Sequence, residues 1–340
     1  MPKVLFICKQ RQTEYGVSYG LLNSCRFLCN ALKTLGVEGK VVSVIDNNCI
    51  DKEVHQYKPT HVFIEALWVV PEKFHVLLPL HKNVKWYVRL HSNVPFLANE
   101  GVAMEWIVKY DKIQKQYPNF FISPNSDKLV EALWKTRQIK TIYAPNVYCP
   151  HKYLDAKYER VPIDKSSDVL NVGCFGAIRP MKNHLTQAMA SMIFANKLGK
   201  RLHFHINGRC EQNGENGHRN LVHLFAGTPH KLIGHPWVNH DEFMSLVKEM
   251  DLGIQISFSE TFNIVAADFV TAGVPIVGSS EISWLNMWYK EPYPTDIDDI
   301  VLFLYLAYYG RKINLHSLNK LGLDVYNCKA LDAWVDLLFY

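Results

Sequence analysis

Short apolar, β-branched runs recur along the chain and alternate with segments of helical spacing. Six such runs precede residue 147, and five follow residue 169. Most are separated by helix-like stretches, of which 19–36 and 240–251 are the clearest. This alternation predicts an α/β fold with two doubly wound parallel sheets. The predicted strands are KVLFIC, KVVSVI, HVFIEAL, KWYVRLH, NFFISP and KTIYAPN in the first half, then LNVGCFG, LHFHING, NLVHLF, LGIQIS and PIVGSS.

A polar segment divides the two sets of strands. Residues 151–168 contain Pro162 and lack periodicity, which is typical of a linker. We therefore expect an N-terminal Rossmann-like domain over residues 1–160 and a second one over 161–325, with a final helix at 326–340 that crosses back to the first. Two such domains are expected to face each other across a cleft, where ligands commonly bind.

In the second half, an acid follows a predicted buried strand. The run LGIQIS ends in a tight turn that contains Glu260, and a helix follows with Asp268 inside it. Gly273 supplies the C-cap of this helix, and Pro275 stops it before the next strand. Ligands of open parallel sheets bind at the carboxyl ends of strands, beside helix N-termini. Glu260 therefore stands where a ligand is expected.

A second turn of this half combines glycines with cations. The strand LNVGCFG ends at Gly173 and Gly176, and Arg179 and Lys182 follow before a predicted helix. Small residues allow close approach of a ligand to the backbone, and two cations at a helix start are suited to a diphosphate. Solvent-facing cations are the alternative interpretation of this motif.

Composition indicates an ordinary globular protein and excludes several classes. The chain has 340 residues, of which 48% are hydrophobic and 20% charged. No apolar run approaches the roughly 20 residues that span a bilayer, and the first residues enter a strand rather than a signal peptide, so a cytoplasmic location is expected. The eight cysteines form no CxxC pair and are expected to be reduced.

Together the two turn motifs resemble those of a known enzyme family. The pattern Gly-x-x-Gly-x-x-Arg-x-x-Lys-Asn is followed about eighty residues later by Ser-Glu-x-Phe, an acid eight positions after the Glu, and Ala-Gly-x-Pro-Ile-Val. This is similar to the GT-B retaining glycosyltransferases, the group that includes glycogen, sucrose and mannosyl transferases. The resemblance implies hexosyl or pentosyl transfer from a nucleotide-diphosphate sugar, by a front-face mechanism, without a metal or other cofactor.

The resemblance implies a role for each matching residue of the second domain. Arg179 and Lys182 match the pair that grips the donor diphosphate and stabilises the leaving nucleotide. Glu260 matches the acid that bonds the hydroxyls of the donor sugar, and Asp268 the acid that holds the ribose. The donor is also expected to touch the backbone of four further residues: Gly176, Phe262, Asn263 and Ile264.

Matches in the first domain are fewer. His91, in RLHS, fits the family's histidine beside the reacting sugar, and Gly16 and Gly20 fit its glycine-rich loop near the donor phosphates. The segments around Ser126 and Asn146 look like later markers of the family's first domain. A structural histidine at the end of a strand is the alternative for His91.

The chain departs from the family pattern at two positions. Asp268 stands where the family has the longer Glu, and an acceptor pair for the ribose is retained. Asn263 stands where the family has Gly after the Phe, and Asn tolerates unusual backbone dihedrals better than most residues. Glu260 has an alternative role as a charge at a helix N-terminus.

A metal site is an alternative that the sequence disfavours. Asp296, Ile297 and Asp298 spell a DxD motif, the metal signature of a different glycosyltransferase fold, but their position before a long apolar helix favours N-capping. His203 and His205 alternate along a strand without convincing ligand spacing.

The distribution of charge along the chain bears on the chemical class of the acceptor. Residues 1–160 hold 22 Lys and Arg against 14 Asp and Glu, while the remainder holds 15 against 18. A basic first half favours an anionic acceptor such as nucleic acid or a membrane glycolipid, although a solvated basic face without a partner is the commoner explanation of such a bias. Lys109, Lys112 and Lys115 contribute to it, beside an amphipathic stripe at 106, 110, 113 and 117 that is typical of core packing.

The chain also resembles, in size and style, the compact phage glycosyltransferases that decorate hydroxymethylated DNA bases. A DNA acceptor is therefore preferred over a glycolipid or polysaccharide, and no stable protein partner is implied. A GT-B sugar-nucleotide epimerase and a non-catalytic nucleotide-sugar binder stay open. A nicotinamide dehydrogenase is disfavoured because EYGVSYG is not a GxGxxG fingerprint.

Overall fold

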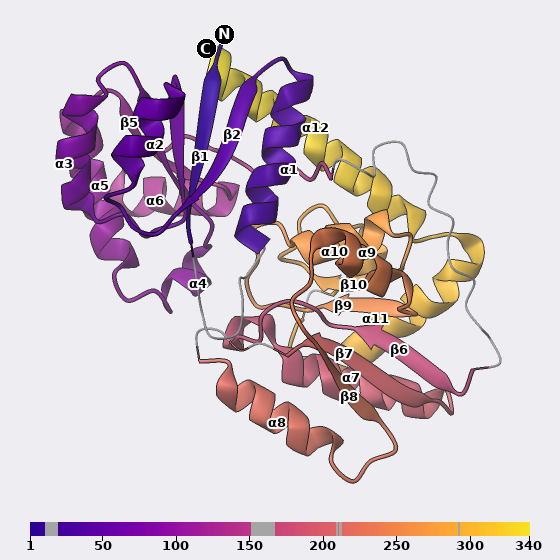
Figure 1. The fold of residues 1–340 in the computed structure, drawn as a ribbon. Helices are drawn as coiled ribbons and strands as arrows, with labels where there is room; N and C mark the ends of the chain where they lie inside the picture. The colour runs from indigo at the N-terminus through magenta and orange to yellow at the C-terminus, as the bar shows by residue number, and fades with distance from the viewer. Residues whose placement is uncertain (11–19, 151–166, 209, 211–212, 292) are drawn as a thin grey trace. The chain divides into compact units, whose positions relative to one another are not determined.

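The computed structural model divides into two compact units (Figure 1). Unit 1 comprises Met1–Leu154 and Asn327–Tyr340, and unit 2 comprises Asp155–Tyr326. The structure describes residues 1–10, 20–150, 167–208, 210, 213–291 and 293–340. The segment expected to link two domains lies largely outside this part of the chain, as does Gly16.

Unit 1 contains a five-stranded parallel sheet. The central strands are buried on both faces, as the continuous apolar runs predict; every residue of HVFIE is buried. The order is β2-β1-β3-β4-β5, formed by β1 (Lys3–Lys9), β2 (Glu38–Val44), β3 (His61–Glu65), β4 (Lys85–Leu90) and β5 (Phe120–Pro124).

Helices cover both faces of this sheet. One face packs Leu5, Val62 and Val88 into a core with α2, α3, α5 and α6. The other face carries an aromatic stack in which the Phe63 ring lies 4.9 Å from that of Trp334. The bounds are α1 (Gly20–Thr34), α2 (Ile50–Tyr57), α3 (Pro71–Leu80), α4 (Val94–Leu97), α5 (Ala103–Gln116), α6 (Asp127–Arg137) and α12 (Ser317–Phe339).

Unit 2 contains a six-stranded parallel sheet whose strands, numbered from β6 along the chain, lie in the doubly wound order 3-2-1-4-5-6. Alternate strand residues point to opposite faces. Val172 and Ile254 join the core with α7, α8 and α11, whereas Gly173 and Gly253 lie under Phe269 of α10. The order β11-β10-β9-β6-β7-β8 is formed by β6 (Val169–Gly173), β7 (Arg201–Asn207), β8 (Lys231–His235), β9 (Leu252–Gln255), β10 (Ile276–Ser279) and β11 (Lys290–Glu291).

The helices of unit 2 follow the strands in alternation, so the predicted α/β fold with two doubly wound parallel sheets is confirmed. They are η1 (Pro180–Lys182), α7 (His184–Lys197), α8 (Glu215–Phe225), α9 (His240–Lys248), α10 (Ile264–Thr271), η2 (Met287–Tyr289), α11 (Ile297–Gly310) and η3 (Arg311–Ile313).

Two predicted strands are wrong. NLVHLF is the end of helix α8, where Leu221 and Phe225 are buried at helical spacing; short apolar runs do not distinguish the two structures. The strand of that region is instead β8, an edge strand. KTIYAPN forms no strand, although the amides of Ile142 and Ala144 donate to carbonyl groups of β5.

Candidate functional site

The first turn of the site follows β6 in unit 2. Gly173 has no space for a side chain, because an added Cβ would lie 2.6 Å from the Phe175 ring. Gly176 has a φ of 111°, and its amide donates to the side-chain oxygen of Asn207 at 2.8 Å. Arg179 then caps η1, and Lys182 is the last residue of that short helix. The glycines thus shape the turn that places both cations.

The second turn follows β9, the neighbour of β6 in the sheet. Because the two strands are parallel, their carboxyl ends share one edge. Glu260 lies in this turn and forms an ion pair with the Lys182 ammonium group. The Glu260 side chain is 9% exposed and that of Lys182 is 23% exposed. The structure therefore brings together the cation and the acid that the sequence assigns to donor binding.

The backbone conformation of Asn263 shows how the chain accommodates asparagine at a position where the family it resembles has glycine. Its φ of 66° lies in the left-handed region, which glycine and asparagine adopt most readily. The side-chain oxygen of Asn263 accepts from the amide of Ala266 at 2.8 Å and so caps α10. The required backbone conformation is retained without glycine.

Phe262 and Ile264 flank that residue. Phe262 is buried, and its carbonyl accepts from the Trp284 indole at 2.8 Å. Ile264 is the first residue of α10. The predicted helix boundaries agree with the structure at the other end as well, since Gly273 follows the helix with a φ of 70°.

Asp268, the residue predicted to bind the ribose, is almost fully enclosed by the protein. It is 2% exposed, and one carboxylate oxygen lies 2.8 Å from Nε2 of His240. His240 is the first residue of α9, and its side chain is 16% exposed. The acid predicted to hold the ribose thus has a histidine partner that sequence reasoning did not identify.

A buried histidine lies beside the cations. His184, the first residue of α7, is 4% exposed, and neither ring nitrogen has a hydrogen-bond partner among the described residues. Burial, and then the charges of Lys182 and Arg179, lower the pKa of His184 to about 3. This ring is therefore neutral at physiological pH and adds no charge beside the two cations.

His91 belongs to a different group, at the carboxyl edge of the sheet in unit 1. Its Nε2 lies 2.6 Å from a carboxylate oxygen of Glu65, and its Nδ1 lies 3.2 Å from the side-chain nitrogen of Asn125. Burial lowers the pKa of His91 and outweighs the opposing effect of the hydrogen bond that His91 donates to Glu65. Because both ring nitrogens have partners, His91 is held as a neutral, oriented imidazole.

Arg89 completes this group. Its guanidinium lies 3.1 Å from Glu65, and both side chains are fully buried. Burial raises the pKa of Glu65, but Arg89 and His91 together outweigh it, so the net pKa is lowered. Arg89 also donates to the carbonyls of Ala144 and Pro145. The sequence does carry a signal for Glu65 and Arg89, since each is a charged residue inside an otherwise apolar strand.

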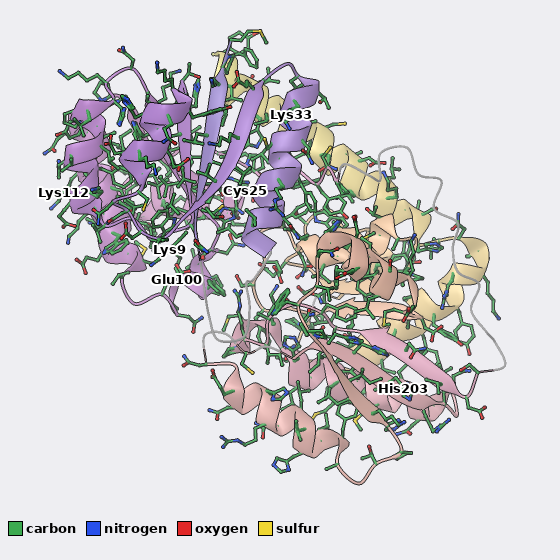
Figure 2. The ribbon with its side chains drawn as sticks, in the orientation of Figure 1. Lys9, Cys25, Lys33, Glu100, Lys112 and His203 are labelled. Atoms are coloured by element: carbon green, nitrogen blue, oxygen red, sulfur yellow. The ribbon has the colours of Figure 1, made fainter. Side chains whose placement is uncertain are left out.

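Gly20 starts α1 in unit 1. Cys25 lies on the same helix (Figure 2). Its sulfur is 3.5 Å from that of Cys8, and both thiols are reduced. Ser126 caps α6 by position, and Asn146 accepts from Arg89 at 2.6 Å. Of these residues, Asn146 thus belongs to the buried network around Arg89.

The alternative metal motif caps a helix. The Asp296 side chain accepts from the amide of Asp299 at 3.1 Å, which confirms the capping interpretation. Within the described ranges, no group of three or more His, Cys, Asp or Glu side chains is arranged to hold a metal ion. His205 instead bonds His235 at 2.9 Å on neighbouring strands. His203, on the same strand as His205, is half-buried (Figure 2).

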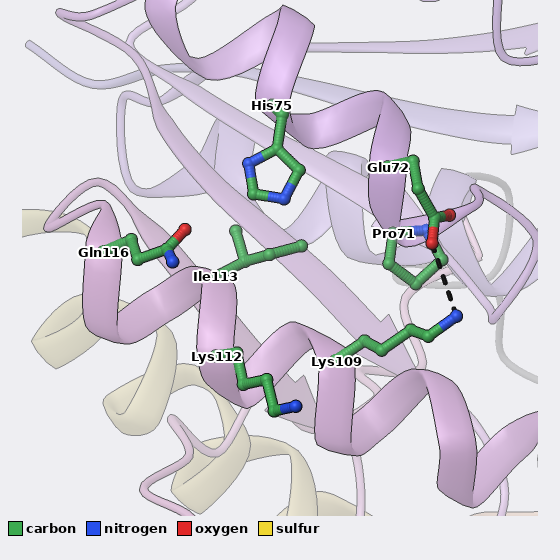
Figure 3. Close-up of a pocket in the computed structure, with 7 residues that line it drawn as sticks. All are labelled: Pro71, Glu72, His75, Lys109, Lys112, Ile113 and Gln116. Atoms are coloured by element: carbon green, nitrogen blue, oxygen red, sulfur yellow. Dashed lines mark hydrogen bonds and ion pairs between the residues drawn. The ribbon is translucent and has the colours of Figure 1, made fainter.

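Two basic residues of α5, Lys109 and Lys112, line a shallow surface groove in unit 1 (Figure 3). The groove, of about 220 Å³, lies between α3 and α5. Lys109 pairs there with Glu72 and with Glu105, and Lys115 pairs with Asp111. Local acids thus offset much of this positive charge, which weakens it as a nucleic-acid surface. The groove residues are Pro71, Glu72, His75, Lys109, Lys112, Ile113 and Gln116.

No helix in the described part of the chain is both long and apolar enough to span a bilayer.

No family model matches the chain, and no curated protein matches it. Solved structures are similar to it in fold. The OtsA apo structure has 12% identity and a TM-score of 0.69, covering 100% of this chain and 99% of its own. An α,α-trehalose 6-phosphate synthase from Burkholderia multivorans has 12% identity and a TM-score of 0.66, over 99% and 96% of the two chains.

A third similar structure is Anabaena Alr3699/HepE in complex with UDP and glucose. It has 13% identity and a TM-score of 0.65, covering 98% of this chain and 99% of its own. These similarities show that the chain has the GT-B type of fold, as the sequence predicts.

Proposed function

We propose that the chain is a retaining glycosyltransferase that uses a UDP-linked hexose, with UDP-glucose as the first candidate. The observation that carries the proposal is the convergence of Lys182 and Glu260, which follow adjacent parallel strands and meet as an ion pair. A nucleotide sugar presents both a diphosphate for the cation and hydroxyls for the acid.

Arg179 and Lys182 are assigned to the departing diphosphate. Preorganised cations aimed at developing negative charge contribute about 3 kcal/mol each to transition-state stabilisation. Glu260 accepts hydrogen bonds from the sugar hydroxyls, while Asp268, with His240, is assigned to the ribose. The backbone at Gly176 and at Phe262 to Ile264 is assigned to the sugar and phosphates. The roles of Gly16, Gly20 and His91 beside the donor stay predictions.

The donor identity is supported by two similar structures. One is HepE in complex with UDP and glucose, and the other is the E. coli trehalose-6-phosphate protein bound with UDP-2-fluoro glucose. A third similar structure concerns glycosyl transfer with retention by trehalose-6-phosphate synthase. No metal is assigned to the reaction, since Asp296 and Asp298 serve a helix terminus.

The acceptor we propose is a sugar phosphate. The name trehalose-6-phosphate synthase, which recurs among the similar structures, denotes formation of a phosphorylated sugar. A sugar phosphate also satisfies the expectation of an anionic acceptor. The hydroxymethylated DNA base preferred on sequence grounds gains no support from these structures, and local acids offset the basic residues of α5 that favoured it.

The proposal is tested first by a thermal-shift screen of UDP-, GDP-, ADP- and CMP-linked sugars. A ligand at 100 times its dissociation constant stabilises by about 2.7 kcal/mol, so the true donor stands out. Transfer is then followed with a hexose phosphate, hydroxymethylcytosine duplex DNA and glycolipid vesicles as competing acceptors. Hydrolysis or transfer of the donor separates an enzyme from a binder, and recovery of only an epimerised donor rejects transfer.

A further inference from the structure

Asn263 occupies a position where glycine would satisfy the required backbone conformation without a side chain. Its φ of 66° favours glycine, the residue that the resembling family carries there. The Asn263 side chain is nevertheless well enclosed, with the residue 7% exposed. What this side chain contacts therefore shows what the asparagine adds to the site.

The Asn263 amide forms three of the four hydrogen bonds open to it, including both that its nitrogen can donate. The oxygen accepts from the amide of Ala266, and the nitrogen donates to Gln255 and to Glu260, both at 3.0 Å. A side-chain amide has two N–H donors and one oxygen that can accept two hydrogen bonds. The backbone donor on one side and the two acceptor oxygens on the other allow only this orientation.

Gln255 anchors the network to the sheet. It lies on β9, is 3% exposed, and donates to the carbonyl of Phe175 at 2.8 Å. Its own oxygen consequently faces Asn263. A continuous chain of hydrogen bonds thus runs from the turn after β6, through two buried amides, to the Glu260 carboxylate.

Lys182 reaches the same Glu260 oxygen from η1. A diphosphate carries more negative charge than one carboxylate and competes for this ammonium group. When Lys182 turns to a diphosphate, the largely buried Glu260 carboxylate loses its cation. The bond from Asn263 does not depend on Lys182 and persists.

We propose that Asn263 is a positioning residue for donor recognition. Its amide holds the Glu260 carboxylate toward the sugar hydroxyls while the donor diphosphate takes Lys182. A nucleotide sugar replaces the lost partner of Glu260 with its hydroxyls, whereas bare UDP does not. Asn263 therefore sets the preference for the donor over the UDP product. This inference rests on the proposed function and deepens it.

The experiment measures calorimetric affinities for UDP-glucose and for UDP with the full chain. Asn263→Gly keeps the positive φ and removes the amide, and Asn263→Asp keeps the helix cap but replaces the N–H donors with oxygen. A hydrogen bond to a charged group is worth about a tenfold change in affinity or more. We expect both variants to lose UDP-glucose affinity about tenfold, with UDP affinity changed less than about threefold.

Glu260→Gln provides the complementary readout. It releases Lys182 from its ion pair, so UDP should bind more tightly than to the wild type while UDP-glucose loses its advantage. Asn286→Asp is the matched control, because Asn286 also caps a helix, through the amide of Trp288. This control should leave the ratio of the two affinities unchanged. Thermal unfolding of each variant establishes that it is folded.

Equal losses for UDP and UDP-glucose in folded Asn263 variants would overturn the inference, as would wild-type affinities for both ligands. Either result leaves the proposed function standing, because the wild type still binds the donor. A folded wild type that binds neither ligand overturns the proposed function itself, and the inference with it.

Discussion

Each unit has a charged cluster at the carboxyl edge of its sheet, and the two clusters differ in how their charges are partnered. In unit 1, Arg89 and Glu65 are fully buried, and Arg89 also bonds backbone carbonyls. In unit 2, Lys182 and Glu260 form a partly exposed pair on two turns. A buried, multiply bonded pair is a structural element that resists exchange, whereas a partly exposed pair can trade partners with a ligand.

The largest effect is expected from the buried pair. Arg89→Met leaves the Glu65 carboxylate buried without its guanidinium and should lower the unfolding free energy by about 4 kcal/mol. Urea denaturation monitored by circular dichroism measures this loss. Lys109→Met removes the exposed ion pairs of Lys109 with Glu72 and Glu105 in the same unit and should leave the unfolding free energy nearly unchanged. A loss below about 1 kcal/mol for Arg89→Met contradicts the structural role.

The second effect is catalytic rather than structural. Lys182→Ala removes a cation from the departing diphosphate and should lower kcat by about 100-fold or more, which corresponds to about 3 kcal/mol. Its unfolding free energy should change much less than that of Arg89→Met. Initial-rate kinetics with UDP-glucose measure the effect, and Lys248→Ala, in α9, is the control. Unchanged turnover in a folded Lys182→Ala variant rejects the assignment.

The third prediction concerns the pH dependence of stability and tests whether the His184 ring is neutral beside Lys182 and Arg179. The pKa of His184 is lowered to about 3 by burial and the neighbouring cations. The unfolded chain therefore takes up the proton first as the pH falls, and stability that is present above about pH 6.5 is lost toward pH 3. His184→Phe removes this linkage.

Urea unfolding at pH 7 and pH 5 tests that prediction. The wild type should lose about 2 kcal/mol between the two values because of His184. The His184→Phe variant should lose correspondingly less, and the exposed His223→Phe control should behave like the wild type. Parallel losses in all three proteins show that His184 titrates normally.

The smallest effect separates helix capping from metal binding. Asp296→Ala removes the cap of α11 and should lower the unfolding free energy by about 1 kcal/mol, without affecting turnover. Asp298→Ala, in the first turn without that cap bond, should cost less. Loss of transferase activity in either variant, restored by a divalent cation, shows that the motif binds metal.

The fold was predictable because its central strands are buried on both faces. HVFIE and KVLFIC read as continuous apolar runs, and both are strands. The edge strand β8 has only two apolar side chains, which are half-buried, so its sequence carries little signal. NLVHLF was ambiguous for the opposite reason, since four apolar residues in six suit a strand as well as a helix.

The site was predictable as far as local spacing determines it. The Gly, Arg and Lys positions after β6 and the Glu after β9 each lie within one turn, so a sequence motif describes them. Gln255 and His240 act through partners 8 and 28 residues away in the chain. Such pairs depend on the packing of strands and helices, which no short motif encodes.

The most direct test of the account follows the reaction itself by NMR. Purified protein is incubated with UDP-glucose and a hexose phosphate, and the anomeric signals of the product are observed. The account predicts release of UDP and a new glycosidic bond with the α configuration of the donor. Inversion at the anomeric carbon, or a folded protein that binds and consumes no nucleotide sugar, would contradict it.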